Sequence, residues 1–393
     1  MRTYRYLIVG GGLTADAACK GIRERDPDGT IGLVADEAHP PYARPPLTKA
    51  LWKGDDEDTI WCGTPELGVD LRPSRTIVSL DLPGRQATDD AGEIYSYERL
   101  LLATGGRPRR LPFGGDEVIY FRTLDDYRRL RALADDDSRF LVIGGGFIGS
   151  EIAAALAMNG QPVTMVFPEP GIGARIFPAD LSAFVTGYYR DKGVELLADA
   201  SVSGIEHAGG VTRVATKDGR TLETDVIVAG LGIEPRTELA AAAGLPVEDG
   251  IVVDERARVR GHEDVFAAGD VARFPAVALD TTMRVEHEDN AKSQGRLAGI
   301  NMAGAEESYD HLPFFYSDLF DLGYEAVGEL DPRQETLAEW DEPNRTGVVY
   351  YLDGERHPRG VLLWNVFGRV DAARDLISAH QPIEAGTLTA PVA

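Results

Sequence analysis

The residues Phe140–Glu151, FLVIGGGFIGSE, join an apolar run to closely spaced glycines. The pattern predicts a buried strand over Phe140–Ile143, a tight turn over Gly144–Gly146, and a helix that begins at Phe147. Glu151 then falls on the second turn of this helix. A strand, a glycine turn and a helix in this order are typical of the start of a Rossmann-type unit.

The glycines of this turn have the spacing of the dinucleotide-binding fingerprint, Gly144-x-Gly146-x-x-Gly149. In that fingerprint the first glycine allows the turn, the second lets a pyrophosphate approach the backbone, and the third lets the helix pack on the strand. Glu169 follows the next predicted strand, Val163–Phe167, where an acid for a ribose 2′-hydroxyl is expected. The spacing alone also fits a glycine-rich turn that binds nothing.

The N-terminus repeats this arrangement. Gly10 and Gly12 follow a predicted strand over Arg5–Val9. Ala15 takes the place of the third glycine, which the fingerprint permits, and Asp36 stands where a ribose-binding acid is expected. We therefore predict an α/β protein with two Rossmann-like dinucleotide-binding domains, each a three-layer ββα unit.

Length and charge limit the classes of function. The chain has 393 residues, which is enough for two or three domains, and a net charge of −24. Such a charge disfavours binding to nucleic acid and to anionic membranes. The sequence contains no run of about 18 apolar residues that would span a membrane and no apolar signal segment, so we expect a cytoplasmic protein.

The cysteines and other potential metal ligands are sparse. Cys19 and Cys62 are far apart and form no CxxC pair, which removes the paired-thiol mechanism of disulfide reductases. Cys19 is expected in the core, whereas Cys62 lies beside Trp61 in a loop and leaves a catalytic thiol open. No cluster of residues has the spacing of metal ligands, so we predict no metal site.

Four prolines lie between His39 and Lys49, around Arg44. Because proline fixes φ and lacks an amide donor, the run predicts a rigid extended path. Such a path would hold Arg44 and Lys49 against a ligand. The alternative is that both are solvated surface cations.

Two further strand ends carry groups that can contact a cofactor. The predicted strand Arg99–Ala103 ends at Thr104 and Gly105, where the backbone either approaches a cofactor or forms a plain turn. The stretch Val265–Asp270 predicts a buried strand that ends in Gly-Asp. The carboxylate of Asp270 can accept hydrogen bonds from a polyol, or it can cap a following helix.

The order of the predicted elements indicates that one domain is inserted in another. After Pro235 the chain returns to the first domain, and an aromatic-rich region begins near Asp310. We predict a first dinucleotide domain over 1–113 and 236–306, a second over 114–235, and a small C-terminal α+β domain over 307–393.

Motifs along almost the whole chain carry a family resemblance. They include GGGLTADAA, PPYARPPLTKALW, LLATGGRPR, IGGGFIGSE, VAGLGIEP, VFAAGDVA and VLLWNVFGRVDAARDLI. Together they resemble the FAD/NAD(P)H-dependent pyridine nucleotide oxidoreductases of the ferredoxin reductase type, and most closely the bacterial relatives of apoptosis-inducing factor. The resemblance implies that the first domain binds FAD and the second binds NADH.

The resemblance also implies which residues contact each cofactor. The FAD-binding residues would be Gly10, Gly12, Ala15, Asp36, Arg44, Lys49, Thr104, Gly105 and Asp270. The residues at the NADH pyrophosphate and ribose would be Gly144, Gly146, Gly149 and Glu169. Those around the nicotinamide and the flavin would be Phe147, Glu151, Gly232, Glu286, His287 and Tyr316. Lys49 and Glu151 are expected to pair at the flavin and to act in catalysis.

The implied function is an FAD-containing, NADH-dependent oxidoreductase. Hydride would pass from NADH to FAD, and electrons then to an external acceptor such as ferredoxin. The alternative is a redox sensor or binding protein like apoptosis-inducing factor, with slow NADH oxidation through a reduced flavin–NAD complex. Tyr316 and Glu288 stand where relatives often have tryptophan, which leaves the acceptor open. Both a monomer and a homodimer remain possible.

A group of arginines offers a docking surface for an acidic ferredoxin. Its members are Arg107, Arg109, Arg110, Arg128, Arg129 and Arg131. Two negatively charged proteins associate faster when a local positive patch steers them. The alternative is that these arginines balance neighbouring acids on a solvated face.

Overall fold

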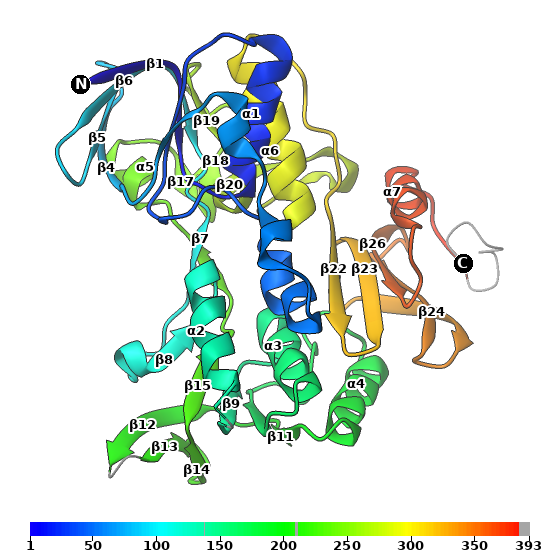
Figure 1. Cartoon of the computed structure of the whole chain (residues 1–393). Helices are drawn as coiled ribbons and strands as arrows, with labels where there is room; N and C mark the ends of the chain where they lie inside the picture. The colour runs from blue at the N-terminus through cyan, green and yellow to red at the C-terminus, as the bar shows by residue number, and fades with distance from the viewer. Residues whose placement is uncertain (137, 209–210, 385–393) are drawn as a thin grey trace. The chain divides into compact units, whose positions relative to one another are not determined.

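The computed structural model describes residues 1–136, 138–208 and 211–384 (Figure 1). Within them the chain divides into two compact units. Unit 1 comprises Met1–Ala43, Asp58–Arg107 and Glu234–Pro313. Unit 2 comprises Arg44–Glu57, Pro108–Ile233 and the described part of Phe314–Ala393. No helix within the described ranges is long and apolar enough to cross a membrane.

Unit 1 is built on a sheet with the strand order β3-β2-β1-β6-β5-β4, in which β19 also pairs with β6. Helices α1 and α6 lie side by side (Figure 1). The bounds are β1 (Arg2–Val9), β2 (Ile31–Val34), β3 (Asp70–Arg72), β4 (Ile77–Asp81), β5 (Gln86–Asp89), β6 (Ile94–Leu102), β19 (Val265–Ala267), α1 (Leu13–Arg25) and α6 (Glu288–Met302). Strands β1, β2, β3, β6 and β19 are parallel, as expected of a Rossmann-type core.

Smaller elements complete unit 1. A four-stranded sheet has the order β17-β18-β20-β21. The bounds are β17 (Val247–Glu248), β18 (Gly250–Val252), β20 (Ala272–Ala276), β21 (Thr281–Met283) and α5 (Glu238–Ala242). Two of the five places where the chain passes from one unit to the other lie within β7 (Gly106–Pro108) and β16 (Ile233–Pro235).

Unit 2 contains a parallel sheet with the order β11-β10-β9-β15-β8. All four residues of β9 are buried, because helices and sheet layers cover both faces of such a strand. The bounds are β8 (Val118–Tyr120), α2 (Leu124–Ala134), β9 (Phe140–Ile143), α3 (Phe147–Met158), β10 (Val163–Val166), α4 (Ala179–Asp191), β11 (Glu195–Leu197) and β15 (Val226–Ala229). Strands β12 (Val202–Ala208), β13 (Val211–Thr216) and β14 (Thr221–Thr224) form a separate antiparallel sheet.

The C-terminal part of unit 2 is an antiparallel sheet with the order β22-β23-β26-β25-β24, followed by helix α7. The bounds are β22 (Phe314–Leu319), β23 (Leu322–Gly328), β24 (Glu335–Glu342), β25 (Thr346–Leu352), β26 (Pro358–Trp364) and α7 (Val370–Ser378). Tyr188 of α4 donates a hydrogen bond to Asp321, and Phe177 packs against Tyr324 and Trp364. These contacts join the C-terminal sheet to the second dinucleotide-binding region.

The α/β class and the two Rossmann-like units are confirmed, and one local prediction is wrong. The proline run is not extended: Pro45–Thr48 and Ala50–Lys53 are 3-10 helices, η1 and η2. The reason is that the φ angle of proline also suits the first positions of a helix. The strand predicted over Arg99–Ala103 is confirmed with other bounds, because it is the end of the longer β6, which stops at Leu102. The three-domain boundaries stay a prediction, and residues 385–393 of the third domain lie outside the described residues.

Candidate functional site

The first candidate site lies at the carboxyl edge of the parallel sheet in unit 1. Val9 at the end of β1 pairs with Val34 of β2 and with Leu102 of β6. Ala267 of β19 pairs with Leu102 as well, so these strands end at one edge. The predicted residues that follow these ends are Gly10, Asp36, Thr104 and Asp270. Ligands of open α/β sheets bind outside this edge.

The residues of the first glycine turn serve different purposes. Gly10 has a φ of 127°, and a Cβ added there would lie 2.0 Å from the carbonyl oxygen of Ala103. A Cβ added at Gly12 would meet no atom within 4 Å, and the φ of Gly12, −97°, suits any residue. Packing therefore requires the first glycine but not the second, and the open space fits a pyrophosphate at the start of α1. Ala15 fills the third position and is fully buried.

Arg236 is a residue of this edge that the sequence analysis missed. Its guanidinium forms an ion pair with Asp36. Its carbonyl oxygen accepts a hydrogen bond from Thr104 Oγ1 at 2.8 Å, and its amide donates to the carbonyl oxygen of Gly105 at 3.0 Å. Arg236 thereby connects the predicted ribose-binding acid to the turn after β6. Its place directly after the motif GIEP was the available signal.

A second missed residue, Gln294, lies beneath the turn that carries Asp270. Asp270 lies within the 3-10 helix Gly269–Val271 and does not cap a longer helix. The Gly269 amide donates to Gln294 Oε1 at 2.8 Å. Gln294 is fully buried, and its Nε2 has no hydrogen-bond partner among the described residues. Buried donors without a partner are rare, so a ligand oxygen at this edge fits the site.

The second candidate site lies at the carboxyl edge of the parallel sheet in unit 2. A Cβ added at Gly149 would lie 2.0 Å from the carbonyl oxygen of Gly144, so helix α3 packs here only through a glycine. Gly144 has a φ of 114°, and its Cβ would meet the carbonyl oxygen of Gly230 at 2.3 Å. Gly146 is exposed, and a Cβ there would meet nothing within 4 Å. Gly232 also lies at this edge and is exposed. The pattern again leaves room for a pyrophosphate beside the second glycine.

Glu169 follows β10 at this edge and pairs with Arg175. The Nη2 atom of Arg175 lies 2.5 Å from Glu169 Oε1. The guanidinium is 81% exposed and the carboxylate 20% exposed. The carboxylate therefore neutralises a cation that would otherwise attract a phosphate at this position.

Lys49 and Glu151 form the ion pair that the family resemblance implied. Lys49 Nζ lies 2.7 Å from Glu151 Oε1, and the two side chains are 10% and 4% exposed. Lys49 is therefore not a solvated surface cation. Arg44 is not one either, because its guanidinium donates to the carbonyl oxygen of Arg122 at 3.0 Å.

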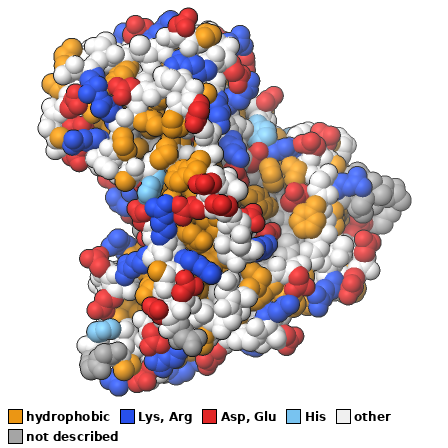
Figure 2. Space-filling model, in the orientation of Figure 1, with side chains coloured by type: hydrophobic (Ala, Val, Ile, Leu, Met, Phe, Trp, Pro, Cys, Tyr) orange, Lys and Arg blue, Asp and Glu red, His pale blue; other side chains and the backbone are white. Residues whose placement is uncertain are grey.

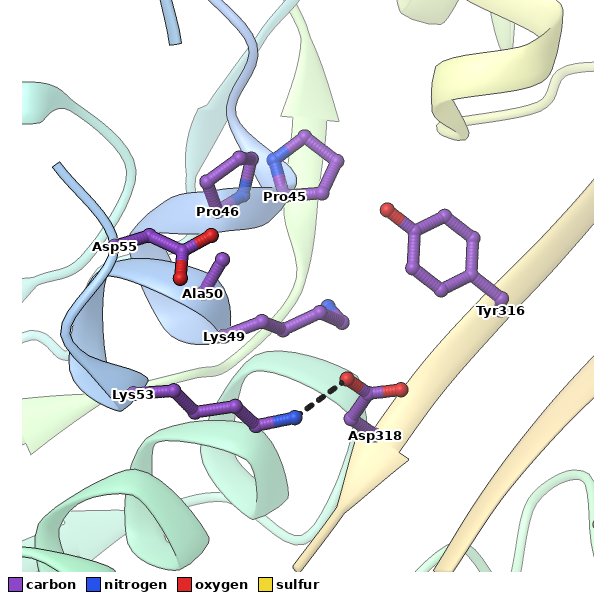
Figure 3. Close-up of a pocket in the computed structure, with 8 residues that line it drawn as sticks. All are labelled: Pro45, Pro46, Lys49, Ala50, Lys53, Asp55, Tyr316 and Asp318. Carbon is purple, nitrogen blue, oxygen red and sulfur yellow. Dashed lines mark hydrogen bonds and ion pairs between the residues drawn. The ribbon is translucent and has the colours of Figure 1, made fainter. Parts of the chain in front are cut away.

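A pocket of about 230 Å³ opens beside Lys49. Figure 3 shows the ring of Tyr316, on β22, facing Pro45 and Pro46 across this pocket. Lys49 Nζ lies 5.4 Å from the centre of the Tyr316 ring. The remaining lining residues are Ala50, Lys53, Asp55 and Asp318, of which Lys53 and Asp318 pair at 3.0 Å. Cationic and aromatic groups therefore share one opening.

Phe147 lies at the first position of α3, and Glu286 and His287 precede α6 in unit 1. The Phe147 ring packs edge-on against Phe315 at 5.3 Å. Arg284 binds Glu286 at 2.5 Å. Desolvation lowers the pKa of His287 to about 4, against the opposing effects of Asp270 and Asp289, so the imidazole is neutral at pH 7. The places of Phe147, Glu286 and His287 around the nicotinamide and the flavin stay a prediction.

Neither cysteine supports thiol chemistry. Cys19 is buried in the core, as predicted, and both thiols are free. Desolvation raises the pKa of Cys62 to about 11, which keeps the thiol protonated at neutral pH. Across 1–136, 138–208 and 211–384, no group of three or more His, Cys, Asp or Glu residues is placed to hold a metal ion.

Comparisons with known proteins agree with this geometry. A family model described as pyridine nucleotide-disulphide oxidoreductase matches residues 4–295, and one described as the C-terminal part of mitochondrion-associated apoptosis-inducing factor matches residues 298–346. Apoptosis-inducing factor 1 of Dictyostelium discoideum is 32% identical over 424 residues, covering 97% of this chain and 79% of that protein. Monodehydroascorbate reductase 3 of Arabidopsis thaliana is 35% identical over 361 residues, covering 84% and 81%.

A solved structure agrees as well. The reductase in the covalent putidaredoxin reductase–putidaredoxin complex matches with a TM-score of 0.91 and 30% identity, covering 98% of this chain and 95% of that chain. The family model covers most of the sequence, and members of the family use FAD and NAD(H). The carboxyl edges of the two parallel sheets have room for these dinucleotides beside Gly12 and Gly146. The chain is therefore a member of the pyridine nucleotide-disulphide oxidoreductase family, with FAD and NADH as its cofactors.

Proposed function

We propose that this protein is an NADH-dependent reductase that passes electrons from FAD to an external acceptor such as ferredoxin. The observation that carries the proposal is the buried Lys49–Glu151 pair, which keeps a cation beside an open aromatic pocket. Bound FAD supplies the redox chemistry, while the protein supplies orientation and electrostatics. Lys49 would hold positive charge where negative charge develops on reduction.

The acceptor follows from relatives rather than from the site itself. One similar structure is a reductase bound to putidaredoxin, which supports a small redox protein as the partner. Another relative is named for monodehydroascorbate, which supports a small-molecule acceptor instead. The deciding experiment is anaerobic stopped-flow reduction by NADH, followed by mixing with ferredoxin, monodehydroascorbate and ferricyanide. Rapid turnover with ferredoxin would support the proposal. Turnover only with small molecules would contradict ferredoxin as the electron acceptor.

A second candidate function rests on the C-terminal match to apoptosis-inducing factor at residues 298–346. In this case the protein is a redox sensor whose slow reaction with NADH changes its binding to a partner. Slow reduction and a long-lived reduced state with every acceptor would favour the sensor. The oligomeric state stays a prediction, as does the cytoplasmic location, which the two free thiols support.

We expect kcat/KM for NADH to exceed that for NADPH by about tenfold or more, because Glu169 can accept a hydrogen bond from a 2′-hydroxyl but repels a 2′-phosphate. Arg175 would attract that phosphate, but it is paired with Glu169. Steady-state kinetics with both nucleotides tests the preference. Glu169→Gln should narrow the ratio, whereas Glu223→Gln, at another exposed glutamate–arginine pair in unit 2, should not. Equal values for the parent protein would refute the preference.

The arginine group supports docking less than the sequence suggested. Arg107 pairs with Glu234 and Glu238, and Arg128 pairs with Glu57. Figure 2 shows acidic and basic side chains mixed over the visible face. These pairs favour the alternative of balanced charges. The side chains of Arg109 and Arg110 are exposed, and Arg110 is only 4.0 Å from a single exposed acid, Asp116, so these two arginines are the best candidates for a docking contact.

If Arg109 and Arg110 steer ferredoxin, reversing both to glutamate should slow ferredoxin reduction at low salt by about tenfold and weaken its salt dependence. Turnover of ferricyanide should stay unchanged, because a small acceptor needs no docking surface. Arg333→Glu, at an arginine that is 87% exposed in the turn before β24, is the charge-reversal control. Unchanged ferredoxin reduction in the double variant would exclude this surface.

A further inference from the structure

We propose that Thr48 and Ser317 are positioning residues for the Lys49–Glu151 pair, so that the C-terminal sheet helps to form the redox site. The inference rests on the proposed function, in which Lys49 faces the flavin. Thr48 lies within the motif PPYARPPLTKALW, but the sequence assigns a role to neither hydroxyl, because the segments that meet here are far apart in the chain.

Glu151 accepts hydrogen bonds from three side chains. Oε1 accepts from Lys49 Nζ at 2.7 Å and from Ser317 Oγ at 2.6 Å. Oε2 accepts from Thr48 Oγ1 at 2.5 Å. Thr48 is 5% exposed and Ser317 is 1% exposed, so water replaces neither donor. Both carboxylate oxygens of Glu151 are thus bound, by Thr48 of η1, by Lys49 directly after η1 and by Ser317 of β22.

The two hydroxyl groups are held by rigid structure. Thr48 is the last residue of η1, whose first two positions are prolines. Ser317 lies in the middle of β22 and pairs with Tyr324 of β23. The lysine side chain, by contrast, is a flexible stem with a charge that can point in several directions. The hydroxyls therefore fix the carboxylate, and the fixed carboxylate holds the ammonium group in one place.

The two hydroxyl groups do more than fill space, because they donate hydrogen bonds to a buried negative charge. A buried carboxylate needs several donors to remain favourable, and its single cationic partner satisfies only one oxygen. If one hydroxyl is lost, the carboxylate can rotate, and Lys49 moves with it. The buried side chains of Tyr189 on α4 and Tyr324 on β23 also interact electrostatically with Glu151, and neither carries a positive charge. They cannot replace the lysine.

The test compares Thr48→Val and Ser317→Ala in the FAD-loaded protein with Lys49→Ala. We expect each hydroxyl deletion to lower the rate constant of flavin reduction at saturating NADH by about tenfold, the factor typical of a hydrogen bond to a charged group. We expect the equilibrium constant for two-electron reduction of the flavin to fall about tenfold as well. This change corresponds to a midpoint potential that is lower by about 30 mV. In a Glu151→Gln background, both deletions should have much smaller effects.

Two further variants and one binding measurement separate a positioning role from a role in stability alone. Thr48→Ser keeps the hydroxyl and should restore both rate and potential. Thr186→Val removes a different buried hydroxyl, on α4, which donates to the carbonyl oxygen of Ser182 at 2.7 Å. It should lower the melting temperature without moving the midpoint potential. FAD titration of the apoprotein, followed by fluorescence, should show weaker binding for Thr48→Val than for Thr48→Ser.

The outcomes distinguish this inference from the proposed function. If Lys49→Ala reduces flavin at the parent rate and potential, the proposed function itself fails. If Lys49→Ala is impaired while Thr48→Val and Ser317→Ala keep the parent rate and potential, only the positioning role is refuted. If Ser317→Ala does not fold, the comparison of Thr48→Val with Thr48→Ser decides the inference.

Discussion

Lys49→Ala is expected to slow the reduction of bound FAD by NADH by about 10²-fold, the loss typical when a preorganised charge-stabilising group is removed. Lys49 is only 10% exposed and is held by Glu151, so it remains in one place before and after reduction. A side chain that does not reorganise stabilises developing charge better than water does. Single-turnover stopped-flow measurements at saturating NADH test this.

Lys53→Ala is the matched control, because Lys53 lies in the adjoining η2 and is 45% exposed in its pair with Asp318. Exposed pairs of this kind contribute little, so its reduction rate should match the parent. Lys49→Ala should also destabilise the fold by about 3 kcal/mol, since it leaves a buried carboxylate unpaired. Adding Glu151→Gln should recover stability but not the reduction rate. A Lys49→Ala variant with the parent flavin content and reduction rate would show that Lys49 does not act at the flavin.

Two glycines of the fingerprint in unit 2, the buried Gly149 and the exposed Gly146, should respond differently to an added methyl group. Gly149→Ala would place Cβ at 2.0 Å from the carbonyl oxygen of Gly144, which is backbone and cannot move aside. We expect a loss of stability of about 3 kcal/mol, as for severe overpacking, together with loss of NADH binding. Thermal denaturation and NADH titration of the FAD-loaded protein measure the two effects.

Gly146→Ala should leave the melting temperature unchanged, because its Cβ would meet no atom within 4 Å and its φ of −86° suits alanine. NADH binding should nevertheless weaken by about tenfold or more, because the methyl group would occupy the space for the pyrophosphate. Unaltered NADH affinity in Gly146→Ala would indicate that the turn binds no pyrophosphate. Unaltered stability in Gly149→Ala would contradict the packing of α3 on β9.

Local sequence patterns were sufficient to predict the two Rossmann-like units. The turns at Gly10 and Gly144 require positive φ angles, and Gly149 permits a close approach that no other residue allows. These are properties of the backbone within one strand–turn–helix segment. A single sequence therefore reveals them without knowledge of the rest of the fold.

Local patterns also misled where one residue type suits two conformations. The prolines before Lys49 suggested an extended path, but Pro45 and Pro46 begin a 3-10 helix. The fixed φ angle of proline is compatible with both, and the contacts of the neighbouring segments select between them.

The sequence by itself determined the two dinucleotide-binding turns, the class of the fold and, through the family resemblance, the pairing of Lys49 with Glu151. Only the tertiary structure decided what surrounds that pair. Thr48 and Ser317 donate to Glu151 across 103 and 166 residues of chain, and Arg236 reaches Asp36 across 200. Serine, threonine and arginine occur throughout the chain, and no local spacing marks those that matter. Their roles arise because buried carboxylates take the donors that folding brings within reach, and that selection is made in three dimensions.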